Sequence, residues 1–259
     1  MAKPKNTAPE VQSVDVMQVV RGGINVCVLG SSPLILNRMS EKAKRELLMP
    51  KGKKTAVEKA TSLKHNPIEE YRASAYRINA GDSPTLLAAL STSFKGAMAT
   101  AALDLPGTKK AQIGRLTYVN GDYVPIYGVP QLFMSIVRSA DMNRTPDVRT
   151  RAIVAKWACY LSITYIRPLM REQAVSNLLA AAGMSIGVGD WRHEKGKGNY
   201  GQFELVSSDD PRFLEIVANG GREAQIEALE NPTCYDDETA SLLGWFDEEL
   251  ARRSLRGVA

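Results

Sequence analysis

Stretches in which apolar and polar residues alternate with a period of two predict several β-strands in this chain. The segment 14–29 contains the first one or two of them, and we expect its second half, 24–29, to be buried on both faces. Further strands are predicted at 132–137, 157–165 and 202–206. The alternation is clearest at 157–165, and Pro168 ends that strand because proline has no N–H to donate.

Apolar residues spaced three and four positions apart predict five helices. The first begins at Ser83-Pro84, where serine caps the helix and proline fits its first position, and it ends before Pro106. The second covers 169–182, with Gly183 at its C-cap. Three more are predicted at 211–219, 222–230 and 237–253.

Two connecting segments carry turn and charge signals. Asn120-Gly121 lies between β-favouring runs within 115–127 and predicts a hairpin with a type I′ turn, because both central residues of that turn need positive φ. The segment 138–151 is polar and rich in arginine, and we expect it to be a loop between two strands. Without insertions, the order is therefore strand, helix, hairpin, strand, helix, strand.

This order predicts an α+β fold, a ferredoxin-like or RRM-like antiparallel sheet with helices on one face. The opposite face is then open, and RRM domains bind nucleic acid there. We expect a disordered N-terminus over 1–10 and an RRM-like core over 11–206. A basic insertion at 38–64 interrupts that core, and an acidic helical extension over 207–259 follows it.

The composition excludes several classes of protein. The chain has 259 residues with an ordinary balance of apolar and charged side chains. No run approaches the roughly 18 apolar residues of a membrane helix, and the N-terminus lacks the apolar stretch of a secretory signal. Three distant cysteines and two histidines argue against a disulfide framework or a zinc site. We therefore expect a cytoplasmic protein with no cofactor and no membrane partner.

Charge is unevenly distributed along the chain. Residues 204–259 carry 13 acidic and five basic side chains, whereas residues 1–203 carry 15 acidic and 28 basic ones. A basic body of this kind is typical of proteins with an anionic partner, most often nucleic acid. The alternative is a solvated surface whose charge is merely lopsided.

The insertion 38–64 contributes nine of these bases against three acids. It has too little apolar content to pack a core face, so we expect it to protrude from the body. Its candidate nucleic-acid-binding residues are Lys42, Lys44, Arg45, Lys51, Lys53 and Lys54.

The segment 187–201 combines five glycines with aromatic and basic residues. Glycine lets a backbone turn tightly and approach another backbone. Aromatic rings stack on bases and cations neutralise phosphates, and together they bind single strands. The alternative is a hairpin loop whose Trp191 packs in the core. The candidates in this segment are Trp191, Arg192, His193, Lys195, Lys197 and Tyr200.

Two further places supply candidates. The arginine forks of 138–151 suit phosphate oxygens, although Asp–Arg pairs on a surface loop are an alternative for any single residue. Glycine costs about 1 kcal/mol inside a helix, so Gly96 suggests close approach of another chain or of a nucleic-acid strand. These candidates are Lys95, Arg138, Arg144, Arg149 and Arg151.

Catalytic motifs are scarce. Patterns for a P-loop, a zinc protease or a nucleophile elbow are absent. The pair Gly187 and Gly189 follows a predicted helix, the reverse of a dinucleotide-binding turn. Acids at 209–210 and 236–238 suit a divalent ion, but clustered acids in a tail are more often solvated charge. We predict no catalytic and no metal-binding residue.

Three stretches resemble the RAMP superfamily, the Cas7-like backbone proteins of CRISPR effector complexes. Residues 30–37 look like the opening of that family, 93–97 are similar to its helix near the RNA backbone, and 182–203 resemble its late glycine-rich loop and closing strand. The sequence Gly-Asp-Trp-Arg at 189–192 is also similar to uncharacterised bacteriophage proteins, which would place this chain in a bacterial host.

The resemblance implies an RRM-like core, a thumb formed by 38–64, and copies stacked head to tail along a nucleic-acid strand. Some members of the family cut RNA with an aspartate near the thumb, and no residue here matches that site. The acidic helical C-terminus departs from the family's pattern.

Three functions follow from these patterns. The first is a non-enzymatic protein that binds single-stranded RNA or DNA and oligomerises along it, while its acidic tail competes for the basic groove or recruits a protein. The second is a phage structural or assembly subunit whose basic body and acidic tail dock neighbouring copies without nucleic acid. The third is a metal-dependent nuclease. We favour the first.

Overall fold

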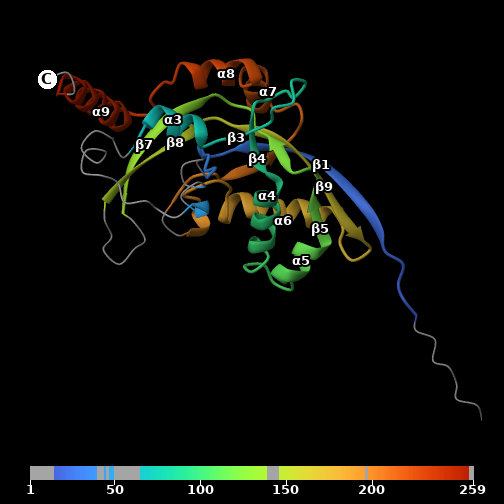
Figure 1. Ribbon diagram of the computed structural model, residues 1–259. Helices are drawn as coiled ribbons and strands as arrows, with labels where there is room; N and C mark the ends of the chain where they lie inside the picture. Colours follow the sequence, from blue (N-terminus) through green and yellow to red (C-terminus); the bar gives the residue numbers. More distant parts are fainter. Residues whose placement is uncertain are drawn as a thin grey trace, which may run out of the picture.

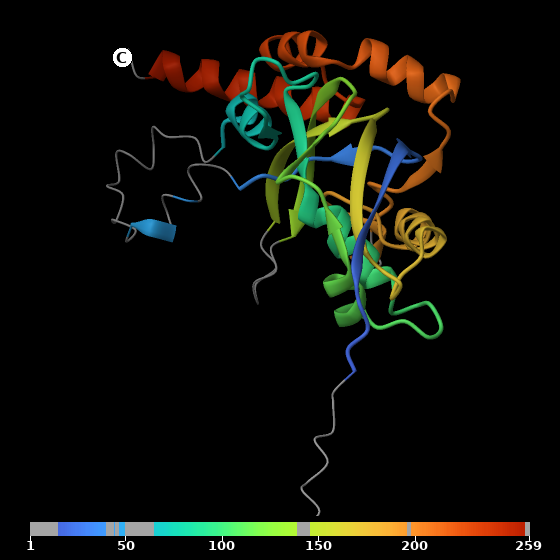
Figure 2. The ribbon, with the colours of Figure 1, turned by 90° about the vertical axis from the view of Figure 1, so that its right-hand side faces the viewer.

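The computed structural model describes residues 15–39, 44, 47–49, 65–138, 146–195 and 198–256. In this part of the chain, antiparallel sheets lie between two groups of helices (Figures 1 and 2). One group consists of α4 (Ser91–Ala101), α5 (Lys110–Leu116) and α6 (Glu172–Ser185). The other consists of α7 (Pro211–Asn219), α8 (Arg222–Glu230) and α9 (Asp237–Arg256).

The largest sheet has four strands in the order β10-β1-β9-β5, and all neighbours are antiparallel. Along the chain, α4 lies between β1 and β5, and α6 lies between β9 and β10. The α+β class predicted from the sequence is confirmed. The strands are β1 (Val20–Gly30), β5 (Thr117–Val119), β9 (Ala158–Arg167) and β10 (Phe203–Val206).

One face of this sheet packs against α4 and α6. Val28 of β1 and Leu161 of β9 belong to the main apolar core, together with Phe94 of α4 and Leu178 of α6. The burial of these side chains supplies most of the free energy that holds the layers together.

The expectation that helices cover only one face is wrong, because α7 covers one end of the other face. Its Phe213 is fully buried and packs on Cys27, Leu29 and Ala158. The Phe213 ring centroid also lies 5.0 Å from that of Tyr160. RRM-like use of the rest of this face stays a prediction.

Two smaller sheets complete the fold. The first has the order β2-β8-β7 and the second has the order β3-β4-β6. Helix α3 packs on β8 and β7. The bounds are β2 (Leu34–Ile35), α3 (Pro67–Ala73), β3 (Tyr76–Arg77), β4 (Leu87–Leu90), β6 (Tyr123–Pro125), β7 (Pro130–Arg138) and β8 (Pro146–Val154).

The interpretation of 138–151 as a loop is wrong at Arg138 and over 146–151, while 139–145 lie outside the described residues. Residues from Pro146 onward form β8, which pairs with β7 from Arg138↔Pro146 to Pro130↔Val154. Thr150 and Ala152 of β8 are fully buried, whereas Arg149 between the two strand ends is exposed. In the sequence, the exposed and half-buried positions of this strand look like a polar loop because they include arginines.

The predicted hairpin over 115–127 is also wrong. The two strands flanking Asn120-Gly121 belong to different sheets, since β5 pairs with β9 and β6 pairs with β4. Gly121 has a φ of +79°, but Asn120 does not have the positive φ that a type I′ turn needs. The Asn120 side chain instead bonds Ser162 at 2.8 Å and Thr164 at 2.9 Å, so it fastens the bend to β9.

The helix predicted from Ser83 begins only at Ser91. The chain before it is held extended by Gln225 of α8, whose buried side-chain oxygen accepts from Leu86 N at 2.8 Å and Leu87 N at 2.9 Å. Backbone N–H groups bonded to a distant side chain are not available to a helix. The cap signal at Ser83-Pro84 therefore does not start one.

Gly183 does not cap α6, which continues to Ser185. A Cβ at Gly183 would lie 2.0 Å from the Phe203 carbonyl oxygen, so glycine here allows β10 to pack against the helix. Helices α7 and α8 have the bounds predicted from the sequence. No helix in the described ranges is long and apolar enough to span a bilayer.

Candidate nucleic-acid interface

A hollow of about 210 Å³ lies where β7 and β8 meet the glycine-rich loop. Asn37 and Ser135 contribute polar groups to its wall. We call it the arginine pocket and define it by Phe133, Arg138, Arg149, Arg151, Asp190 and Trp191. It therefore brings together four residues that the sequence had singled out in two separate stretches.

Strand pairing places two of the arginines. Phe133 of β7 stands opposite Arg151 of β8, and Ser135 stands opposite Arg149. Side chains two positions apart in a strand share a face, so these four residues project from the same side of the sheet. The alternate residues, such as Ala152, are buried in the main core.

The loop that carries Trp191 is fastened to β2 by backbone hydrogen bonds. Asp190 N donates to Ile35 O at 3.0 Å, and Gly201 N donates to Pro33 O at 2.8 Å. Within the loop, Val188 N donates to Gly201 O at 2.9 Å. These bonds fix Trp191 beside Phe133 of β7 rather than leaving it on a free loop.

Two glycines make this attachment possible. Gly189 has a φ of +86°, and a Cβ there would lie 2.6 Å from Ile35 O. Gly201 has a φ of +72°, and its Cβ would lie 1.7 Å from Val188 O. Both positions combine a backbone conformation that L side chains rarely adopt with a very close neighbour. The expected use of these glycines for close backbone approach is therefore observed.

Trp191 belongs to an aromatic cluster at the edge of the pocket. Its ring centroid lies 6.2 Å from Phe133 and 6.2 Å from Tyr200, and Phe133 in turn lies 5.7 Å from Tyr235. Trp191 is 39% exposed, so it is not the buried core residue of the alternative interpretation. Its φ of +49° is uncommon for a residue other than glycine, and such conformations concentrate at functional sites.

Arg151 is the most buried of the three arginines, with 19% of its side chain exposed. Its Nη1 donates to the Thr150 carbonyl at 3.0 Å, but its buried Nε has no hydrogen-bond acceptor among the described residues. The nearest carboxylate oxygen, on Asp190, is 3.8 Å away. Burial lowers the pKa of the Arg151 guanidinium and the like charge of Arg149 lowers it further, whereas Asp190 and Glu70 act in the opposite direction.

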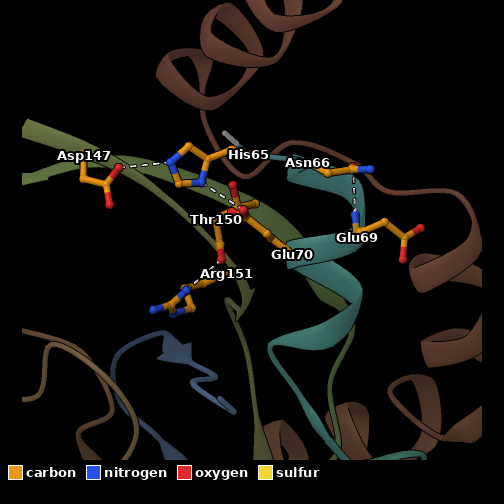
Figure 3. Close-up of polar contacts among 7 residues, drawn as sticks. All are labelled: His65, Asn66, Glu69, Glu70, Asp147, Thr150 and Arg151. Carbon is orange, nitrogen blue, oxygen red and sulfur yellow. Dashed lines mark hydrogen bonds and ion pairs between the residues drawn. The ribbon is translucent and has the colours of Figure 1, made fainter. Parts of the chain in front are cut away.

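The outer end of β8 is fixed by a histidine between two carboxylates (Figure 3). His65 Nδ1 lies 2.9 Å from Glu70 Oε1, and Nε2 lies 3.0 Å from Asp147 Oδ1. Each ring nitrogen therefore faces one carboxylate oxygen, and both polar atoms of the ring are engaged within the protein. We interpret this group as a structural link between α3 and β8, two residues from Arg149.

Other candidates lie away from the pocket or are already paired. Arg192 forms an ion pair with Glu194 at 2.6 Å. Lys95 of α4 lies 5.9 Å from the centre of the Tyr118 ring. A Cβ at the neighbouring Gly96 would meet nothing within 4 Å, so no part of the described chain requires glycine there.

The remaining candidates have these positions. His193 and Lys195 lie in the 3-10 turn η1 (His193–Lys195), and Tyr200 lies in the aromatic cluster. Lys44 is half-buried and does not line the pocket. Lys42, Arg45, Lys51, Lys53, Lys54, Arg144 and Lys197 lie outside the described residues.

A second group of cations was missed by the sequence analysis. Two adjacent hollows of about 480 and 540 Å³ flank the turn between β9 and α6. We call this the distal basic surface and define it by Lys109, Arg115, Arg167 and Arg171. No ion pair joins these four residues to an acid of the described chain. They come from two short segments, neither of which is a charge cluster in the sequence.

The distal basic surface and the arginine pocket lie at opposite ends of β9. Arg167 is the last residue of this strand, and Ala158 at its other end pairs with Leu29, shortly before β2. Ten residues at roughly 3.3 Å each give a separation of about 30 Å along the strand.

No group of three or more His, Cys, Asp or Glu side chains within the described ranges is placed to hold a metal ion. No protein-family model and no curated protein matches this chain. Among solved structures, Cmr6 from Pyrococcus furiosus aligns with 72% of this chain and 99% of its own, at 8% sequence identity and a TM-score of 0.34. A likeness at this level carries no argument about function.

Proposed function

We propose that this protein binds single-stranded RNA or DNA through the arginine pocket, without catalysis. The observation that carries the proposal is the convergence of Arg138, Arg149 and Arg151 with the half-exposed ring of Trp191 around one hollow. Guanidinium groups pair with phosphate oxygens through two parallel hydrogen bonds, and an exposed indole offers a base a surface for stacking.

The same geometry favours a single strand over a duplex. Bases in a duplex are stacked on each other, and a ring such as Trp191 reaches them only when they are splayed out. The pocket is also small, about 210 Å³, and the glycine-rich loop lies directly on β2 beside it. A duplex would present its phosphates at the rim, where only the exposed Arg138 and Arg149 reach them.

Oligomerisation along the strand and membership of the RAMP superfamily are part of the proposal. They are supported by the resemblance of 30–37, 93–97 and 182–203 to that family. They are also supported by the contrast between the basic body and the acidic C-terminal helices, because copies with opposite charges at their two ends attract each other. A phage origin and a cytoplasmic location rest on the sequence alone.

The test compares two arginine variants. Arg149→Gln should weaken binding of a single-stranded oligonucleotide about tenfold, because a hydrogen bond to a charged group contributes roughly 1.5–3 kcal/mol. It should also reduce the slope of log affinity against log salt by about 0.7, the value for one phosphate contact on a single strand. The matched control is Arg212→Gln, since Arg212 is paired with Glu204 at 2.9 Å and Asp210 at 2.8 Å.

Equal affinity and equal salt slope for the two variants would contradict the proposal. Assemblies of the wild-type protein that stay free of nucleic acid would favour the assembly subunit instead. The ratio of absorbance at the nucleic-acid and protein maxima, before and after nuclease, distinguishes that case.

A further inference from the structure

We infer that the arginine pocket binds a phosphomonoester, the phosphate at the end of a nucleic-acid strand, in preference to a phosphodiester within it. The inference rests on the proposed function and specifies which part of the strand occupies the pocket.

The charge of the arginine pocket favours a phosphomonoester. Three arginines and Asp190 give the pocket a formal charge of +2. An internal phosphodiester carries a charge of −1, whereas a phosphomonoester carries about −1.5 to −2 at pH 7. Only the terminal group therefore balances the pocket. An internal phosphate would leave one guanidinium facing like charges in a partly buried site.

The hydrogen-bond donors of the arginine pocket also favour a phosphomonoester. A phosphomonoester has three terminal oxygens, and each can accept hydrogen bonds from a separate guanidinium fork. Arg151 lies deepest, and its buried Nε lacks an acceptor in the described part of the chain. Ser135 and Asn37 on the wall add neutral donors. The donors thus line one hollow, so a single phosphate there can reach several of them.

The volume of the arginine pocket also favours a single end group. Pockets for drug-sized ligands occupy about 300–1,000 Å³, so a hollow of about 210 Å³ holds one end group and not several nucleotides. The exposed part of Trp191 stands at its edge, where the first base of the strand can stack. A phosphate in the pocket and a base on the indole together define a strand end.

The experiment compares three hexanucleotides of one sequence, carrying a 5′-phosphate, a 3′-phosphate or no terminal phosphate. Binding is measured by calorimetry with the full chain. We expect one phosphorylated strand to bind at least tenfold more tightly than the unphosphorylated strand. Arg151→Lys should abolish this advantage, because lysine keeps the charge but loses the planar fork. Arg212→Gln should keep the advantage, and thermal unfolding of each variant verifies its fold.

Three results would overturn the inference, and they are distinguishable from failure of the proposed function. Equal affinity for all three strands, with binding still dependent on Arg149, overturns the terminal-phosphate assignment alone. Competition by a free mononucleotide as tight as by the phosphorylated strand overturns the strand-end assignment and leaves the phosphomonoester chemistry. Absence of binding to any strand overturns the proposed function itself. Because Arg149 is exposed, Arg149→Gln provides a second variant if Arg151→Lys does not fold.

Discussion

The distance from an arginine to its nearest carboxylate distinguishes a candidate binding residue from a paired surface residue in this molecule. Arg192 and Arg149 both lie in stretches that the sequence singled out, yet of the two only Arg192 has a carboxylate partner, Glu194, among the described residues. Arg151 has its nearest acid at 3.8 Å and lies beside another arginine. Sequence alone predicts where cations are numerous. It does not predict which of them strand pairing brings to one face. The distal basic surface was missed because its four cations come from two short segments, neither of which is a charge cluster in the sequence.

The position of Trp191 depends on Gly189, and this dependence is testable. Alanine at Gly189 would keep a φ of +86° only with strain and would place a Cβ 2.6 Å from Ile35 O. We expect Gly189→Ala to lower the free energy of unfolding by about 1–3 kcal/mol and to weaken oligonucleotide binding, because the loop must leave β2. Chemical denaturation measures the first effect and calorimetry the second.

Gly114→Ala is the control for this prediction. A Cβ at Gly114 in α5 meets nothing within 4 Å, so alanine should stabilise the protein by about 0.5–1 kcal/mol and leave binding unchanged. A Gly189→Ala protein that is as stable and binds as tightly as the wild type would contradict the role assigned to the loop.

At the scale of elements, local signals succeeded where they were strong and unopposed. Helix α7 begins as predicted at Pro211, with Asp210 accepting hydrogen bonds from Arg212 N at 2.8 Å and Phe213 N at 3.4 Å. The Ser83-Pro84 signal is of the same kind, yet Gln225 holds the chain after it extended. That residue is 139 positions from Leu86, so no local pattern contains it.

The cover that α7 forms over the four-stranded sheet leads to a prediction about Cys27. Burial raises the pKa of the Cys27 thiol, and Phe213 packs over it. We expect Phe213→Ala to cost about 3–5 kcal/mol of stability and to increase the rate at which Cys27 reacts with a thiol reagent. Mass spectrometry assigns the label, since Cys159 is fully buried and Cys234 is half-buried.

The matched control is Leu214→Ala on the same helix, because Leu214 is 46% exposed and its removal should leave the rate unchanged. Equal labelling of Cys27 in the Phe213→Ala protein and the wild type, under conditions where both are folded, would show that α7 does not cover this face.

At the scale of the whole molecule, the class of fold was predictable but the division into sheets was not. Strands β1, β9 and β10 and helices α4 and α6 follow the predicted order because each has its own periodic pattern, whereas the predicted hairpin contributes only the three-residue strand β5 to this sheet. The two smaller sheets are built from strands as short as two residues, and such strands have no periodicity to detect. Four of the six residues that define the arginine pocket lie on β7 and β8 of one of these sheets.

The length of β9, about 30 Å, lies between the arginine pocket and the distal basic surface, and it predicts that affinity depends on the length of the nucleic-acid strand. Replacing Arg115 and Arg171 by glutamine should leave the affinity for strands of about four nucleotides unchanged. It should weaken binding of strands of about 16 nucleotides. One small single-strand-binding domain covers about 4 to 16 nucleotides, so these two lengths mark the ends of that range. A loss of affinity that is the same for both lengths would mean that the two surfaces do not bind one strand.

Ultraviolet crosslinking of the full chain to a single-stranded oligonucleotide, with the crosslinked residues identified by mass spectrometry, locates the strand on the protein. Stacking on Trp191 and contact with the arginine pocket predict crosslinks in the glycine-rich loop and on β7 and β8. These crosslinks should disappear when a 5′- or 3′-phosphorylated strand without a crosslinking base competes. Crosslinks confined to α7, α8 and α9, or none at all, would contradict binding of a single strand in the arginine pocket.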